Sequence, residues 1–260
     1  MPIISTIVDH GLGLLMGFCF GGKFKNKKEK GFKLKITLPF YYQERFLIGN
    51  KKDIWNQMRC SQDGIYSIPK DREMWVRRAQ DEFPRKVGED LATYLTKISI
   101  KKVFSVGVGA GGMEYHLKKS YPSCELTCSD FEAETIKNLK NVFTECDEFR
   151  VFDLLDTPLT HDFVVMSRVE NEFNDDDLKK IFSMAQSKNI LLIISDVLSL
   201  YRVFILAKDN FVAKIAGRRG PCAGYKRTWD QLESLFSNTY TIKDTTTIGG
   251  LNSVLLERIL

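Results

Sequence analysis

The stretch VFSVGVGAGG, residues 103–112, places four glycines directly after a short apolar run. The apolar, partly β-branched residues before the first glycine favour a strand. Glycine accepts positive φ angles and lets another group approach the backbone closely. When a strand ends in such a turn and a helix follows, backbone N–H groups and the helix N-terminus face a ligand. The stretch therefore predicts a binding turn at the carboxyl end of a strand.

The chain around this turn alternates between strand and helix patterns. Strands are expected in CELTCSD, EFRVFDL, DFVVMSRV and NILLIISDVL, and helices in residues 84–98, GMEYHLKKSYP, EAETIKNLKNVF and DDDLKKIFSMAQSK. Apolar strands that alternate with helices predict an α/β fold whose mainly parallel sheet has helices on both faces. Near residue 250, TYTIKDTTTI and LNSVLLERI are joined by Gly249-Gly250, which predicts an antiparallel hairpin.

The spacing of the glycines and of the next acid points to a nucleoside. Gly107, Gly109 and Gly111 follow the pattern G-x-G-x-G, and Asp130 ends the next predicted strand about twenty residues later. An acid at that offset can accept hydrogen bonds from both ribose hydroxyls of an adenosine-containing ligand. Asp130 is also suited to cap the helix that begins near Glu132, and the two roles are compatible.

From residue 101 to residue 260 the chain resembles the class I S-adenosylmethionine-dependent methyltransferases. VFSVGVGAGG resembles the first motif of that family, LTCSD the second, VFDLL the adenine-facing end of the third strand, and HDFVVMSRVENEF the fourth strand with its loop. The hairpin resembles the reversed last strand. The resemblance implies a Rossmann-like, seven-stranded sheet, S-adenosylmethionine as cofactor, and methyl transfer to an O or N atom.

The resemblance also assigns residues to the cofactor. They are Ser105, Gly107, Gly109, Gly111, Asp130, Phe131, Asp153, Leu154, Ser167 and Arg168. The family commonly has an acid two positions before the first glycine, where this chain has Ser105, so one usual anchor for the methionine end is missing or replaced. Arg77 or Arg78 are candidates to bind the methionine carboxylate.

The loop after the fourth strand is where a general base is expected, because ligands bind outside the carboxyl ends of such strands. It supplies Glu170 and Glu172 as candidate catalytic residues, and spacing does not rank them. The acidic start of the following helix is equally explained by the helix dipole. Methyl transfer depends mainly on positioning, so an unclear base does not argue against activity. No metal site is predicted.

Three regions are expected: an apolar and basic segment over 1–38, an extension over 39–99 that covers cofactor or acceptor, and a methyltransferase domain over 100–260. Residues 3–20 are too polar for a clean membrane-spanning helix. Together with the lysines up to residue 35 they suit peripheral contact with an anionic membrane. The alternative is an apolar segment packed on the body of a cytoplasmic protein. The six cysteines form no C-x-x-C pair and favour buried free thiols.

Charge and composition leave the acceptor open. Residues 1–104 carry 20 Lys and Arg against 11 Asp and Glu, so a polyanion would meet the N-terminal part. The leading hypothesis is a small-molecule or glycan-type acceptor, recognised by residues 40–80 and by the basic and aromatic insertion over 200–229. The alternatives are an RNA methyltransferase, a non-catalytic scaffold with the same fold and, more remotely, a dehydrogenase.

Overall fold

The computed structural model describes residues 35–39, 67–194, 197–199, 201–202, 204–205, 208, 211 and 224–259. Residues 34–260 form one compact unit. The apolar segment over residues 3–20, most of the lysine run and most of the insertion lie outside the described residues. No helix in the described part of the chain is long and apolar enough to cross a bilayer.

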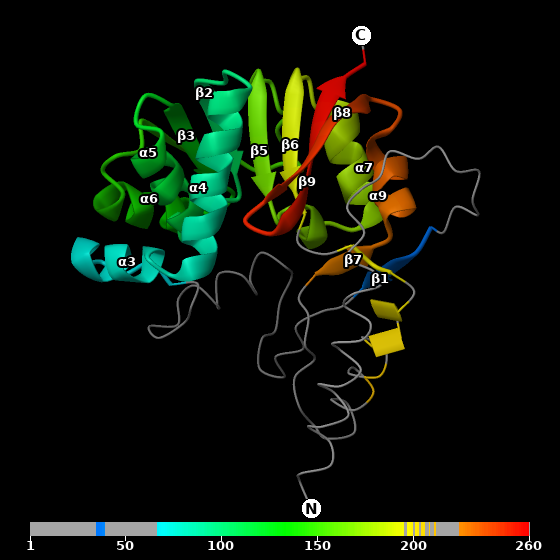
Figure 1. Cartoon of the computed structure of the whole chain (residues 1–260), viewed down its shortest axis with the longest axis horizontal. Helices are drawn as coiled ribbons and strands as arrows, with labels where there is room; N and C mark the ends of the chain where they lie inside the picture. The colour runs from blue at the N-terminus through cyan, green and yellow to red at the C-terminus, as the bar shows by residue number, and fades with distance from the viewer. Residues whose placement is uncertain are drawn as a thin grey trace, which may run out of the picture. The chain divides into compact units, whose positions relative to one another are not determined.

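The centre of the unit is a seven-stranded sheet of order β4-β3-β2-β5-β6-β9-β8 (Figure 1). Its strands are β2 (Lys102–Val106), β3 (Glu125–Asp130), β4 (Glu148–Val151), β5 (Phe163–Ser167), β6 (Asn189–Ile193), β8 (Tyr240–Ile248) and β9 (Leu251–Arg258). Strands β2 to β6 are parallel, whereas β9 runs antiparallel to both β6 and β8. The predicted mainly parallel sheet with a reversed hairpin is confirmed.

Helices cover both faces of this sheet, as predicted (Figure 1). They are α3 (Arg72–Ala79), α4 (Glu82–Lys97), α5 (Gly112–Ser120), α6 (Ala133–Val142), η1 (Glu170–Glu172), α7 (Asp175–Met184) and α9 (Trp229–Phe236). Successive strand residues point to opposite faces. Val165 accordingly packs in a core with α3 to α6, whereas Val164 and Met166 pack in a second core with α7 and α9.

The hairpin turn between β8 and β9 joins the last strands to α4. Gly249 and Gly250 have φ angles of +60° and +81°, which suits glycine at both positions of a tight two-residue turn. The Gly249 N–H donates to Asp90 Oδ2 at 2.9 Å, and a Cβ at Gly249 would lie 2.2 Å from Val87 Cγ2. The glycine therefore also permits a close approach between the turn and α4.

Several short elements were not expected from the sequence. Helix α3 packs on α5 and α6, with Trp75 buried at 1% exposure. Strands β1 (Thr37–Pro39) and β7 (Tyr225–Arg227) form a separate antiparallel pair, and β7 leads directly into α9. These elements carry few periodic apolar residues, so their formation depends on tertiary packing rather than on local pattern.

Candidate cofactor site

The glycine turn follows β2 and combines packed positions with one open position. Gly107, Gly109 and Gly111 all have positive φ, at +67°, +53° and +74°. A Cβ at Gly107 would lie 2.6 Å from Val169 Cγ2, and one at Gly111 would lie 2.9 Å from Leu139 Cδ2. A Cβ at Gly109 would meet no heavy atom within 4 Å. Packing therefore fixes the turn at Gly107 and at Gly111, and the backbone of Gly109 between them is left open.

The Asp130 carboxylate lies against this turn. Its Oδ2 accepts the Gly109 N–H at 3.1 Å, and its Oδ1 accepts the Glu132 N–H at 3.1 Å. The residue is 1% exposed. The second bond is local capping before α6, as the sequence allowed, and the first one joins the ends of β2 and β3. The structure therefore brings the predicted acid to the open glycine.

The end of β4 adds further predicted residues at the same edge of the sheet. The Phe152 N–H donates to the Asp130 carbonyl at 2.9 Å. This bond places Phe152, and Asp153 after it, beside the end of β3. Asp153 and Phe131 are half-buried, and Asp153 Oδ1 accepts the Leu155 N–H at 3.0 Å. The Leu154 side chain is 4% exposed and belongs to the core with α7 and α9. Of the two residues predicted after β4, Asp153 is thus the more accessible.

The loop after β5 lies over the first glycine of the turn. Ser167 is half-buried, and Arg168 is exposed with a φ of +58°. The Arg168 N–H donates to the Ile193 carbonyl at 2.8 Å, and its guanidinium lies 5.2 Å from the centre of the Phe83 ring. This backbone course brings Val169 onto Gly107. The loop and the turn consequently form one packed unit.

The two candidate catalytic glutamates belong to η1, which continues this loop. Glu170 is 3% exposed, whereas Glu172 is half-buried. Arg227 on β7 donates from Nη1 to the Glu170 carbonyl at 3.0 Å and from Nε to Asp175 Oδ1 at 2.6 Å. Burial would raise the pKa of Asp175, but hydrogen bonds from Thr37, Arg227 and Gln231 hold it below its usual value. The sequence did not reveal this network, because Arg227 is remote from η1 along the chain.

The sequence also missed a carboxylate below the turn. Ser105 is 1% exposed and donates from Oγ to Glu114 Oε1 at 2.7 Å. Glu114 belongs to the first turn of α5 and is 2% exposed. A glutamate within the buried stripe of α5 was the available signal. Position 105, where the family commonly has an acid, is thus a serine whose hydroxyl contacts the carboxylate of Glu114.

Three residues of α3 have contacts of their own. Arg77 is 80% exposed in its side chain and pairs with Glu73 at 3.6 Å, and Arg78 donates to Ser67. Trp75 Nε1 donates to the carbonyl of Ala110 within the glycine turn at 2.8 Å. From α3, it is Trp75 that contacts the turn.

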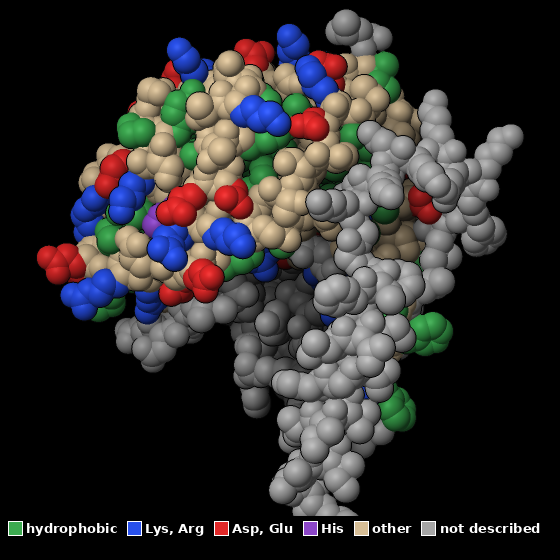
Figure 2. Space-filling model, viewed as in Figure 1, with side chains coloured by type: hydrophobic (Ala, Val, Ile, Leu, Met, Phe, Trp, Pro, Cys, Tyr) green, Lys and Arg blue, Asp and Glu red, His purple; other side chains and the backbone are tan. Residues whose placement is uncertain are grey.

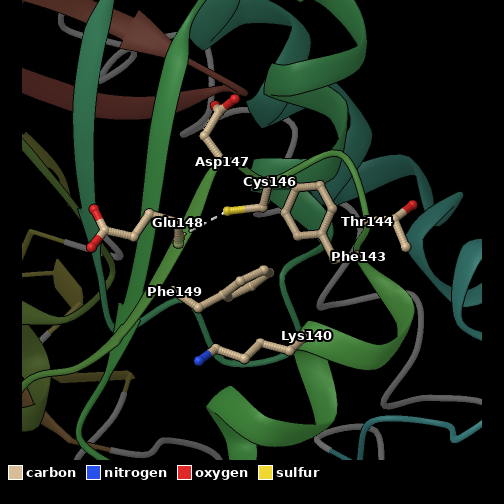
Figure 3. Close-up of a pocket in the computed structure, with 7 residues that line it drawn as sticks. All are labelled: Lys140, Phe143, Thr144, Cys146, Asp147, Glu148 and Phe149. Atoms are coloured by element: carbon tan, nitrogen blue, oxygen red, sulfur yellow. Dashed lines mark hydrogen bonds between the residues drawn. The ribbon is translucent and has the colours of Figure 1, made fainter.

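A hollow of about 490 Å³ lies at the opposite edge of the sheet, before β4 (Figure 3). Its lining includes Phe143, Phe149 and Cys146, whose Sγ donates to the Glu148 carbonyl at 3.1 Å. Cys124, Cys128 and Cys146 are free thiols. Because this hollow lies at the amino ends of the strands, it is separate from the glycine turn. Within the described ranges no group of His, Cys, Asp and Glu could hold a metal ion.

Known structures share this architecture. Human N-acetylserotonin methyltransferase aligns with a TM-score of 0.50 and 21% identity, covering 66% of this chain and 52% of that enzyme. The mitomycin 7-O-methyltransferase MmcR gives 0.53 and 16%, covering 79% and 60%. Magnesium protoporphyrin IX methyltransferase from Synechocystis, solved with S-adenosylhomocysteine, gives 0.53 and 15%, covering 80% and 98%. The chain has the methyltransferase fold.

The methyltransferase fold is supported by structure and not by sequence similarity. Neither the comparison with protein-family models nor that with curated proteins finds a match. The chain spans about half to three fifths of the length of the first two enzymes. Its activity and acceptor therefore have to be argued from its own residues.

Proposed function

We propose that this chain is an S-adenosylmethionine-dependent methyltransferase that acts on an O or N atom of a small molecule or glycan-type acceptor. The observation that carries this proposal is the Asp130 carboxylate held against the open backbone of Gly109. Such a pair offers an acceptor for ribose hydroxyls beside a backbone that a nucleoside can approach. The reversed β9 favours this reading over a dehydrogenase, which would continue into a second nucleotide-binding half.

The described residues suit each part of the cofactor. Asp130 would hold the ribose, Phe131 and Asp153 would flank the adenine, and the turn with Ser167 would face the methionine end. Bound there, S-adenosylmethionine supplies an electrophilic methyl group on a sulfonium. The protein has to align that methyl with the acceptor, and orientation can contribute about 7 to 11 kcal/mol.

A general base would come from η1 in this proposal. Glu170 and Glu172 both remain candidates, and Glu172 is the more exposed of the two. A base typically contributes a factor of about 10² to 10⁴, which is less than alignment contributes. The names of the human and mitomycin enzymes indicate small-molecule acceptors, which supports the same class here.

Binding of the cofactor to Asp130→Asn tests the proposal. The amide keeps the volume and one oxygen but replaces the other by a donor, so it cannot accept from both ribose hydroxyls. Calorimetry should show S-adenosylmethionine binding to the native chain and a loss of at least about tenfold in the variant. Asp162→Asn is the matched control, because Asp162 is exposed and precedes β5 at the opposite edge. Equal affinity in the native chain and both variants would count against the proposal.

The RNA methyltransferase alternative predicts salt-dependent RNA binding. On the face shown in Figure 2, Lys and Arg side chains are interspersed with Asp and Glu side chains over the described surface. That distribution gives no single-sign patch on this face, and a flat salt dependence would exclude the alternative. The scaffold alternative predicts cofactor binding that is weak or absent and no methyl transfer to any member of a broad acceptor panel.

A further inference from the structure

A buried carboxylate beneath the glycine turn has no part in the function argued above. Glu114 is 2% exposed, and its Oε1 accepts the Ser105 hydroxyl at 2.7 Å. With the other described residues it forms no ion pair. Removing a carboxylate from water without an opposite charge is costly, and the serine offsets only part of that cost. The remaining free-energy cost of burying this carboxylate lowers the stability of every folded molecule that keeps it.

The groups around Glu114 make its ionisation sensitive to an added positive charge. Asp130 and Cys128 on β3 and Cys146 before β4 interact electrostatically with it, and none of these is a cation. Burial raises the pKa of Glu114 to about 7, the hydrogen bonds from Ser105 and its own backbone N–H oppose this rise, and Asp130 adds to it. Near neutral pH the carboxyl is thus close to its point of half-ionisation.

The location of Glu114 connects it to the open glycine. Ser105 precedes Gly107 by two residues on β2, and Glu114 follows Gly111 by three residues at the start of α5. Asp130, which raises the pKa of Glu114, also accepts the Gly109 N–H. Two buried carboxyl groups are therefore bonded to residues beside or within one turn, and both would attract a cation bound there.

We propose that Glu114 is a positioning residue for the α-ammonium group of the sulfonium donor, and that it releases its proton as the donor binds. This inference rests on the proposed function. The donor carries an ammonium, a sulfonium and one carboxylate, so its net charge is positive, and a nearby positive charge favours the ionised form of a carboxyl. The attraction is strong because the site is poorly screened by water. An anionic pyrophosphate at the same turn would be repelled. The site would therefore prefer a ligand of net positive charge to an anionic one.

The sign of the pH dependence follows from the proton balance. The free chain binds a proton at Glu114 below about pH 7, and the complex does not. Binding therefore releases a proton, so affinity rises with pH and levels off above about 7. Between pH 5.5 and 7.0 we expect about a tenfold gain in affinity for S-adenosylmethionine.

Calorimetry on the full chain in phosphate and in Tris, which have different ionisation enthalpies, measures this proton release directly. S-adenosylmethionine should release a proton, and S-adenosylhomocysteine, which keeps the ammonium, should do so too. Methylthioadenosine, which has neither charge, should bind without proton release. Equal proton release with methylthioadenosine, or none with S-adenosylmethionine, would contradict the role of Glu114.

Variants separate this role from a structural one. Glu114→Gln should bind S-adenosylmethionine with a flat pH profile and about tenfold more weakly at pH 7.5. Glu134→Gln, an exposed first-turn glutamate on α6, should keep the native profile. Ser105→Ala removes a bond that lowers the pKa of Glu114, so its profile should shift to higher pH; it answers the question even if Glu114→Gln does not fold.

The outcomes also separate the two proposals. If the native chain binds no S-adenosylmethionine, the proposed function fails and the inference fails with it. If the donor binds but Glu114→Gln keeps the native pH profile and proton release, the function stands and Glu114 only joins α5 to β2.

Discussion

At the scale of the residue, two glycines with positive φ differ in what surrounds them. Gly109 and Gly250 have φ angles of +53° and +81°, and a Cβ at either position would meet no heavy atom within 4 Å. Gly250 faces open space in a surface hairpin. Gly109 instead belongs to the turn after β2, and its N–H donates to Asp130 Oδ2. The open space beside Gly250 therefore has no proposed role, whereas the open space beside Gly109 is the proposed position of the nucleoside.

Alanine substitutions at these two glycines form a matched pair. Each should lower the free energy of unfolding by about 1 kcal/mol, because an L-residue at positive φ is strained. Gly109→Ala should in addition weaken S-adenosylmethionine binding more than about tenfold, since the methyl group occupies the approach to the backbone. Gly250→Ala should leave binding unchanged. Calorimetry and urea denaturation measure both effects, and equal affinities would show that the ligand lies elsewhere.

The residues that could be predicted are those whose chemistry is local in sequence. Gly107, Gly109 and Asp130 stand at fixed offsets that a strand, turn and helix impose. Glu114 and Arg227 could not be found this way, because each acts only where packing buries it beside a distant partner. For Glu114 the sequence offered only its place within the buried stripe of α5, and that place does not identify Ser105 as its partner.

At the scale of the element, the loop from β5 to α7 is held by an arginine from outside it. Arg227 is 4% exposed and bonds the Glu170 carbonyl, the Phe173 carbonyl and Asp175. It also stacks on Tyr225, with its guanidinium carbon 5.5 Å from the ring centre. Strand β7 therefore fixes the loop that carries both candidate catalytic glutamates.

Arg227→Met should lower the free energy of unfolding and remove the hydrogen bonds that hold the loop from β5 to α7. Loss of the guanidinium leaves two carbonyls and the Asp175 carboxylate short of a donor, at a cost of about 3 kcal/mol. Thermal denaturation should show a Tm lower by about 6 to 12 °C. Arg150→Met is the control: its pair with Glu148 is about half exposed, so the cost should stay below about 1 kcal/mol. Similar losses in both variants would contradict a special role for Arg227.

The longer elements were predictable and the short ones were not. The expected helix over 84–98 is α4, and the predicted strands of the sheet are all present. Helix α3, helix α9 and the β1–β7 pair have at most eight residues each, too few for a periodic pattern to emerge. Their positions depend on contacts such as Trp75 with the turn, which no local signal encodes.

At the scale of the whole unit, two apolar cores are separated by the sheet, and the candidate site lies along its carboxyl edge. Glu114 is an ionisable group buried on α5, one of the helices that form the first core with the sheet. Its protonation therefore affects the stability of the whole unit. The effect has a definite sign, because burial raises its pKa above the value of an unfolded chain.

The stability of the native chain should fall relative to Glu114→Gln as pH rises. Between about pH 4.5 and 7 the folded state holds a proton on Glu114 that the unfolded state has lost, so folding is favoured at the acidic end. From pH 5 to pH 7.5 the free energy of unfolding of the native chain should fall by roughly 2 to 3 kcal/mol relative to that of Glu114→Gln. Urea denaturation of both proteins at the two pH values measures it, and parallel profiles would contradict the assignment.

The position of β9 has a consequence during synthesis. It is the last of the seven strands along the chain, yet it lies between β6 and β8. Until residues 251–258 leave the ribosome, the edge of β6 has no partner on that side, although Asn189–Ile193 emerged about 60 residues earlier. At about 5 to 20 residues per second, a nascent chain presents this apolar edge for roughly 3 to 12 seconds. During translation it is therefore a surface that a chaperone can recognise and that a neighbouring nascent chain can join.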